Sequence, residues 1–302
     1  HLQKTPHRSQ QYLSTMTDPD ELYTLRAQYW LGHFALSLEE AKSIARRPMS
    51  AALKAEREEF IVRANLALGH FDKIPPTGDT PAIKLLLLRA KYDQASTPEA
   101  KDAVIESVKA LAASDTSDAS LQLYASQLFF VHGLIRESLQ CVHTGANLEQ
   151  KLMILQLYLR IDRLDLAEEQ LSELQSSDED SVLTQLGSVY VNIATGKSTA
   201  TSAIHTLQSM SEQYGPSPLL VNATAVAQMV VGDYAAAEST LKSAEEQDAD
   251  VLINTVACCQ HLGKPTEPVL KELATKYPSH SYVQGLARVE AAIERESIKY
   301  RA

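Results

Sequence analysis

The chain has 302 residues, of which 28 are Lys or Arg and 38 are Asp or Glu, so its formal charge is −10. This acidic excess argues against nucleic acid or an anionic membrane surface as the primary partner. Apolar residues make up 44% and charged residues 22% of the chain, which is typical of a globular protein. Eleven glycines and twelve prolines are few turn formers for this length, which argues against a many-stranded sandwich or barrel.

The first residues of the chain are predicted to lie outside the fold. Residues 1–17 are mostly polar, begin without methionine and contain no apolar core of a secretory signal. Met16 is a candidate natural start, which would make the residues before it an added or upstream extension. We therefore expect residues 1–17 to form a disordered tail and residues 18–302 to form one helical array.

Glycine spacing predicts a series of helix hairpins. Six glycines each follow one apolar helical stretch and precede another, and the shorter intervals between them are 31, 36 and 37 residues. The two longer intervals, of 64 and 63 residues, have room for further turns near residues 96–98 and 162–163. This period is close to the 34 residues of a tetratricopeptide unit. The six are Gly32, Gly69, Gly133, Gly196, Gly232 and Gly263.

Residues 218–248 match the tetratricopeptide pattern best. Ala225 stands seven residues before the turn at Gly232, and Ala237 and Leu241 follow that turn. Small side chains at positions 225 and 237 would let two antiparallel helices cross closely. No segment shows the sustained alternation of apolar and polar residues that is typical of a strand. The predicted fold is all-α, a tetratricopeptide-like α-solenoid of antiparallel helix hairpins coiled into a curved superhelix.

No pattern indicates an active site, a cofactor site or a metal centre. Gly196-Lys197-Ser198 imitates the end of a phosphate-binding loop, but Val191 stands where that loop requires a glycine. The nine histidines show no metal-ligand spacing, and the three cysteines form no C-x-x-C pair. We expect a non-enzymatic protein with free thiols and no cofactor.

The acidic loop at residues 176–180 has two interpretations. In one, Asp180 or Ser181 caps the next helix and the acidic side chains oppose the helix dipole. In the other, the loop is a phosphorylation or partner-docking site.

The concave face of the solenoid is the candidate binding site. The first helix of each hairpin lines this face, and positions ten, six, three and two before the turn share one side of that helix. Many of these positions are apolar although the opposite side packs on neighbouring hairpins, which predicts burial on both sides. Either a partner segment fills the groove or the superhelix fills it with its own residues. The partner-binding candidates are Leu123, Phe130, Val131, Leu152, Leu159, Val191, Asn222, Val226, Met229, Val230 and Ile253.

Several stretches resemble the epsilon subunit of coatomer. The most specific are Leu-Asp-Leu-Ala at residues 164–167, the acidic loop at residues 178–180 and Gln-His-Leu-Gly-Lys-Pro at residues 260–265. The resemblance runs from about Met16 to the C-terminus.

The resemblance implies a non-enzymatic vesicle-coat subunit. The family looks like a curved solenoid that encircles and stabilises the C-terminal region of the coatomer alpha subunit, among other coatomer subunits. Such a protein would be cytoplasmic and peripheral on Golgi membranes and coated vesicles, in retrograde Golgi-to-ER and intra-Golgi transport. It would reach the membrane only through its partners, which agrees with the lack of basic patches and anchors.

A peptide-binding adaptor of the co-chaperone type is the alternative. Such grooves hold acidic peptide ends with Lys, Arg and Asn at fixed first-helix positions. Here those positions carry no cationic clamp, since they are Leu123 and Gln127, Leu152 and Gln156, and Ile253 and Ala257. A helical-repeat enzyme is a third possibility, for which the sequence offers no catalytic constellation.

Overall fold

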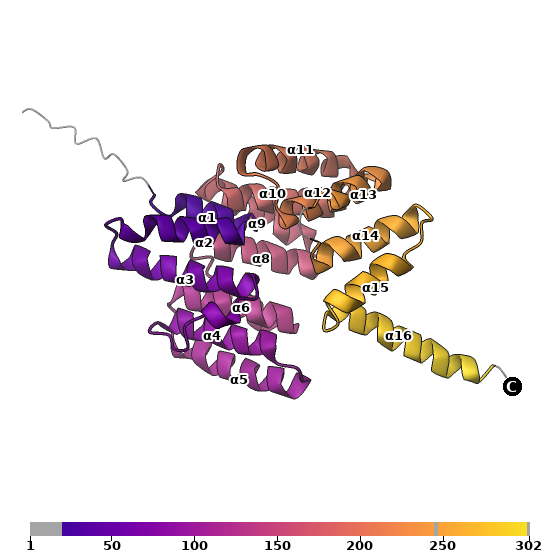
Figure 1. Ribbon diagram of the computed structural model, residues 1–302. Helices are drawn as coiled ribbons and strands as arrows, with labels where there is room; N and C mark the ends of the chain where they lie inside the picture. The colour runs from indigo at the N-terminus through magenta and orange to yellow at the C-terminus, as the bar shows by residue number, and fades with distance from the viewer. Residues whose placement is uncertain (1–19, 245–246, 301–302) are drawn as a thin grey trace, which may run out of the picture.

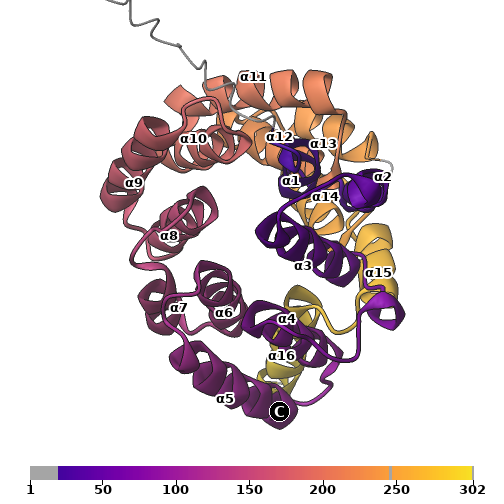
Figure 2. The ribbon, with the colours of Figure 1, turned by 90° about the vertical axis from the view of Figure 1, so that its left-hand side faces the viewer.

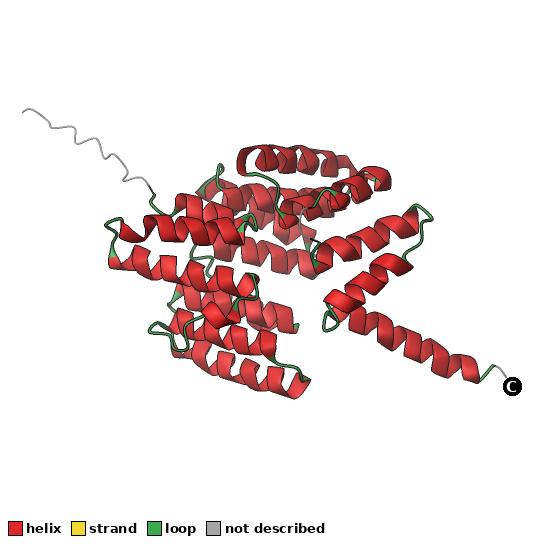
Figure 3. Cartoon of the chain, viewed as in Figure 1, coloured by secondary structure: helices red, strands yellow, loops and turns green. Residues whose placement is uncertain are grey.

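The computed structural model describes residues 20–244 and 247–300, and these two ranges are helical with no strand (Figure 3). The predicted tail at residues 1–17 lies outside them. Two short 3-10 helices, η1 (Ile44–Arg46) and η2 (Phe71–Lys73), accompany the α-helices. The α-helices are α1 (Tyr23–Trp30), α2 (Phe34–Ser43), α3 (Ala51–Ala67), α4 (Pro81–Gln94), α5 (Pro98–Ser114), α6 (Ala119–His132), α7 (Ile135–Val142), α8 (Leu148–Arg160), α9 (Leu164–Ser177), α10 (Val182–Thr195), α11 (Lys197–Tyr214), α12 (Pro218–Val231), α13 (Tyr234–Lys242), α14 (Ala249–His261), α15 (Glu267–Lys276) and α16 (Ser281–Ile298).

The helices form hairpins that follow one another around a curve (Figure 1). Each helix from α4 to α14 packs on the next one, and α4, α6, α8, α10, α12 and α14 also pack on one another in sequence. Seen from the side in Figure 2, α6, α8 and α10 form an inner layer and α5, α7, α9 and α11 an outer one. The predicted all-α superhelix of antiparallel hairpins is confirmed.

Side chains mark where the helices begin. Asp118 caps α6 by accepting a hydrogen bond from the backbone N–H of Leu121 (3.0 Å), and Thr97 caps α5, which starts at one of the predicted extra turns. Ser181 caps α10 by accepting from the backbone N–H of Leu183 (3.3 Å). The acidic loop is therefore the start of a helix, as the first interpretation predicted.

The predicted close crossing lies where α12 meets α13. Ala225, Ala237 and Leu241 are fully buried and share one core cluster. Gly232 ends α12 with a φ of +98°, in the left-handed region that glycine adopts without strain. Gly196 joins α10 to α11 and Lys197 begins α11, so the apparent phosphate loop is a hairpin turn.

The N-terminal helices complete the ring. In Figure 2, α1 and α3 lie between α4 and α12, on the side of the ring opposite α7 and α9. They have a core cluster of their own, made by Leu22, Leu25, Ala41, Ile44 and Phe60. We call residues 20–69, with α1 to α3, the strap, and residues 81–261, with α4 to α14, the body.

Candidate partner-binding groove

A groove with a volume of about 1400 Å³ lies between the strap and the body. On the strap side, residues 32–36 with Ala67 and Leu68 line it. On the body side, the wall combines inner helices with the loop at residues 214–219. The apolar side chains of that wall are Phe130 from α6, Leu159 from α8, Tyr190 and Ile193 from α10, and Val221 and Val226 from α12.

Polar side chains also line the groove, but few of them are cationic. Gln156 and Asn222 lie among the apolar residues, and the amide of Asn254 donates a hydrogen bond to Asn222 (2.7 Å). Arg160 is the one Lys or Arg among the described lining residues, which include Asp162 and Asp250. Because a clamp for acidic peptide ends needs several cations, this wall disfavours the co-chaperone-type adaptor.

Four of the eleven candidate residues line the groove: Phe130, Leu159, Asn222 and Val226. They come from α6, α8 and α12 and are each partly exposed. The helical-face rule therefore places these four on the concave side. Their role in partner binding stays a prediction.

Three other candidates are buried and present no surface to a partner. Leu123 is 1% exposed, Leu152 7% and Val191 4%. Trp30 of the strap packs against the core cluster that contains Leu152 and Val191, and Leu66 of the strap packs against the cluster that contains Leu123. The strap thus fills part of the concave face with the chain's own residues, the second of the two interpretations.

The remaining candidates lie away from the groove. Val131 is 52% exposed and is not among the described lining residues. Met229 is half-buried and packs against the cluster formed by Ala225 and Ala237. Val230 and Ile253 are half-buried and also lie outside the groove lining. A stripe running without interruption along the first helices is therefore not what the structure presents.

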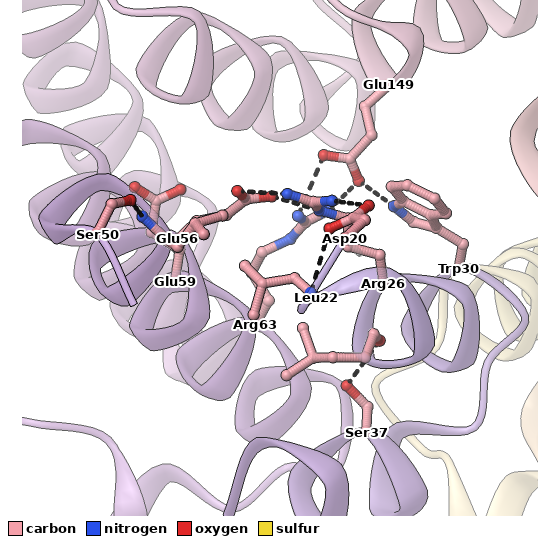
Figure 4. Close-up of polar contacts among 12 residues, drawn as sticks. Asp20, Leu22, Arg26, Trp30, Ser37, Ser50, Glu56, Glu59, Arg63 and Glu149 are labelled. Carbon is pink, nitrogen blue, oxygen red and sulfur yellow. Dashed lines mark hydrogen bonds and ion pairs between the residues drawn. The ribbon is translucent and has the colours of Figure 1, made fainter. Parts of the chain in front are cut away.

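A buried ion pair joins the strap to the body (Figure 4). Glu149, in the first turn of α8, accepts hydrogen bonds from Nη1 and Nη2 of Arg63 on α3 (3.2 and 2.6 Å). The same carboxylate accepts from Nε1 of Trp30 on α1 (2.6 Å). One side chain of the body therefore holds two helices of the strap.

Aromatic rings surround the Arg63 guanidinium. The guanidinium carbon lies 4.4 Å from the ring centre of Tyr29, 4.5 Å from that of Phe60 and 5.1 Å from that of Tyr124. Burial alone would lower the pKa of Arg63, but the Glu149 carboxylate holds it well above its ordinary value. The Glu149 carboxylate therefore favours the charged form of Arg63 inside the junction.

Tyr124 makes a second polar contact across the same junction. Its hydroxyl, on α6, donates to Glu59 on α3 (2.7 Å). Burial raises the pKa of Glu59 above its ordinary value, and the hydrogen bond from Tyr124 offsets part of that rise.

A third set of contacts fastens the strap at the groove rim. The Ser217 hydroxyl donates to the carbonyl oxygen of Leu31 (2.5 Å). The His33 ring nitrogen Nε2 lies 3.2 Å from the carbonyl oxygen of Gly215. The hydroxyls of Tyr23 and Tyr214 are 3.3 Å apart, and burial together with this contact raises the pKa of Tyr214 to about 12. The Tyr214 hydroxyl is therefore protonated at neutral pH.

Sequence reasoning missed the residues that place the strap. Trp30, Arg63 and Glu149 each stand in an ordinary helical pattern, and 86 residues separate Arg63 from Glu149. A buried pair of this kind leaves no local signal in one sequence.

The described residues show no metal centre and no membrane-spanning helix. No group of three or more His, Cys, Asp or Glu side chains in residues 20–244 and 247–300 is placed to hold a metal ion. Within the same ranges, every helix is too short or too polar to cross a bilayer.

Comparison with known proteins identifies relatives along almost the whole chain. The family model "Coatomer epsilon subunit" matches residues 18–301. Coatomer subunit epsilon-1 of Arabidopsis thaliana is 31% identical over 296 residues, which cover 94% of this chain and 98% of that protein. Coatomer subunit epsilon of Dictyostelium discoideum is 27% identical, with 91% and 97% covered.

Solved structures with a similar fold are tetratricopeptide-type proteins of low sequence identity. A chain of the APC/C hetero-tetramer Cut9-Hcn1 matches with a TM-score of 0.59 and 14% identity, covering 92% of this chain and 57% of that one. A tetratricopeptide repeat protein from Parabacteroides merdae matches with a TM-score of 0.54 and 11% identity, covering 89% and 96%. These likenesses concern the fold alone.

The fold, the resemblance read from the sequence and the family match agree. The match covers residues 18–301, which include every described residue that lines the groove. The chain belongs to the coatomer epsilon subunit family and is a non-enzymatic component of the COPI vesicle coat, with other coatomer subunits as its partners.

Proposed function

We propose that the groove holds a segment from the C-terminal region of the coatomer alpha subunit. In this proposal the ring wraps that segment and stabilises the alpha chain in coats for retrograde Golgi-to-ER and intra-Golgi transport. The protein would act in the cytoplasm, held on Golgi membranes and coated vesicles by the rest of the coat. Family membership supports this placement.

The groove is the observation that carries the proposal. Its volume of about 1400 Å³ exceeds the range of roughly 300–1,000 Å³ that is usual for small-molecule pockets. Its wall is mostly apolar, with aromatic and aliphatic side chains from four helices and a few hydrogen-bonding groups. A wall of this size and chemistry suits a folded peptide segment.

Apolar burial should dominate binding. Phe130, Leu159 and Val226 would lose water when the segment enters, and the free energy of that burial does not depend on screening by salt. We therefore expect tight binding whose dissociation constant changes little between low and moderate ionic strength.

The test uses two neighbouring residues of α6. Phe130 lines the groove, whereas Val131 is 52% exposed and lies outside the lining. Affinity for the purified C-terminal region of the alpha subunit is measured by calorimetry for Phe130→Ala and Val131→Ala. If Phe130 is an anchor, its truncation weakens binding by about 1–4 kcal/mol, and truncation of Val131 leaves it unchanged.

Stability has to be measured on the same variants, because Phe130 also packs against the core cluster that runs from α3 to α8. A loss of stability without a loss of affinity would mean that the side chain only supports the fold. Equal affinity losses for the two variants would contradict the groove as the binding site.

A further inference from the structure

We propose that the strap is a latch, which opens to admit the partner segment and closes over it, and that Glu149 holds it shut. This inference rests on the proposed function for the identity of the partner. It adds a moving part, its fastening residue and an order of events.

The strap has a core of its own beside the cores it shares with the body. Leu22, Leu25, Ala41, Ile44 and Phe60 form a cluster within residues 20–69, whereas Ala27, Leu31 and Val62 are buried in clusters with body residues. Residues 70–80, which include Pro75 and Pro76 and only the one-turn helix η2, connect the strap to α4. Sub-global opening occurs in cooperative units with their own core, and such a unit can move while the rest of the fold persists.

The polar part of the fastening is concentrated on one residue of the body. Glu149 accepts from both Arg63 and Trp30, so a single carboxylate serves α1 and α3 together. Arg63 is 4% exposed, and removal of its partner would leave a buried cation unpaired. Loss of this one group therefore favours opening, in which Arg63 reaches water.

The position of the groove gives such an opening a role. The strap forms one wall of the groove and the body forms the other, and the strap closes the ring (Figure 2). A free chain end or a protruding hairpin could enter a ring end-on, but a segment with folded domains on both sides of the ring could not. The non-covalent junction between strap and body is where the ring can part to admit such a segment.

The first experiment measures opening in the free protein by amide hydrogen exchange. Glu149→Gln removes the charge that pairs with Arg63 and should speed exchange of α1 and α3 amides by about tenfold or more, with α12 and α13 unchanged. Glu56→Gln is the matched control, because Glu56 forms a two-bond ion pair with Arg26 inside the strap (both 2.7 Å). Similar effects of the two variants, or uniform acceleration along the chain, would overturn the latch.

The second experiment locks the strap. A Cβ atom at position 32 would lie 3.1 Å from Cβ of Leu219, close to the roughly 3.5–4.5 Å of a disulfide. The oxidised and reduced forms of the double variant Gly32→Cys with Leu219→Cys are compared with each other. Both forms carry the backbone strain of a cysteine at position 32, so a difference between them reports the disulfide alone. The native chain under the same oxidant is the control for Cys141, Cys258 and Cys259.

Association with the C-terminal region of the alpha subunit is followed by stopped flow. The latch predicts that oxidation slows association by about tenfold or more, and that oxidation after binding slows dissociation. Equal association rates for the two forms would show that the segment enters a closed ring, which overturns the latch and leaves the proposed function standing. If neither form nor the native chain binds, the proposed function fails, and the exchange experiment still decides whether the strap opens.

Discussion

The hairpin of α12 and α13 and the junction between strap and body are held together by contacts of different range. In the hairpin, fully buried alanines at positions 225 and 237 let the helices meet along an apolar seam, and the contacting residues lie close in sequence. At the junction, Arg63, Glu59 and Trp30 meet charged or polar partners 65 to 119 residues away, and apolar strap residues are buried among those of the body. The body is thus a row of local contacts, and the ring is closed by long-range contacts, both polar and apolar.

The hairpins of the body and the junction that closes the ring therefore contribute to stability in different ways. A repeat array gains its stability from nearest neighbours, and each unit tolerates change as long as its faces stay covered. A ring gains one more junction, whose loss does not unfold the array. The polar groups of such a junction can be hydrated when it opens, which lowers the cost of opening.

The largest loss of stability is expected when the junction between strap and body is disrupted. Glu149→Leu leaves Arg63 buried without a counter-ion and should lower the free energy of unfolding of the strap by about 3–5 kcal/mol. The double variant Arg63→Met with Glu149→Leu removes both charges and should recover most of that loss. Urea unfolding followed by Trp30 fluorescence reports on the strap. A double variant as unstable as the single one would show that the charge is not the cause.

The next largest loss of stability is expected when the α12–α13 hairpin is overpacked. Ala225→Leu forces extra methylene groups into a fully buried helix crossing and should cost about 1–3 kcal/mol. Ala235→Leu, at an exposed position of α13, adds the same atoms and should cost much less. The stability of both variants is measured as the midpoint of thermal or urea unfolding, followed by circular dichroism. Equal midpoints for the two variants would show that Ala225 does not lie at the helix crossing.

A smaller effect isolates the rim contact. Ser217 caps α12 by accepting from the backbone N–H of Leu220 (3.1 Å) and also donates to Leu31 of the strap. Ser181 makes only the capping contact, to α10. Each serine-to-alanine change should lose a cap, and Ser217→Ala should lose about 0.5–1.5 kcal/mol more than Ser181→Ala. No difference between them in urea unfolding would mean that the rim bond adds nothing.

The smallest effect is a pH dependence at the junction. Burial raises the pKa of Glu59 above its ordinary value of 4.5, so the folded protein binds this proton more tightly than the unfolded chain does. The stabilisation from the proton is complete below pH 4.5 and is lost as pH rises through the folded pKa. Glu59→Gln imitates the protonated group and lacks this dependence. The native chain should therefore lose stability relative to the variant as the pH rises above 4.5, measured by urea unfolding, and parallel curves would contradict this.

The sequence predicts the body well because its rules are local. Turn glycines, helix caps and the small residues of the α12–α13 crossing act within one or two turns of a helix, so Gly232, Ser181 and Ala225 could be placed without a structure. The same helical-face rule put Phe130 and Val226 on the groove wall.

The helical-face rule failed at positions of the body that the strap covers. Leu152 and Val191 do face inward, but the cluster that contains them is covered by Trp30 rather than open to a partner. Periodicity states which side of a helix is apolar and not what covers it. The covering depends on ring closure, and closure depends on a pairing of Arg63 with Glu149 that one sequence does not reveal.

The two partners of the Arg63–Glu149 ion pair are synthesised at different times, because they lie far apart in the chain. Arg63 leaves the ribosome 86 residues before Glu149, which at about 5–20 residues per second is a delay of roughly 4–17 s. During that time the strap has its own apolar core but a cation and an indole N–H without their acceptor. Ser217, the rim partner of Leu31, arrives later still, 186 residues behind it. The nascent protein therefore passes through a stage with an open arc, in which the face that later lines the groove is accessible to chaperones or to a partner chain made nearby.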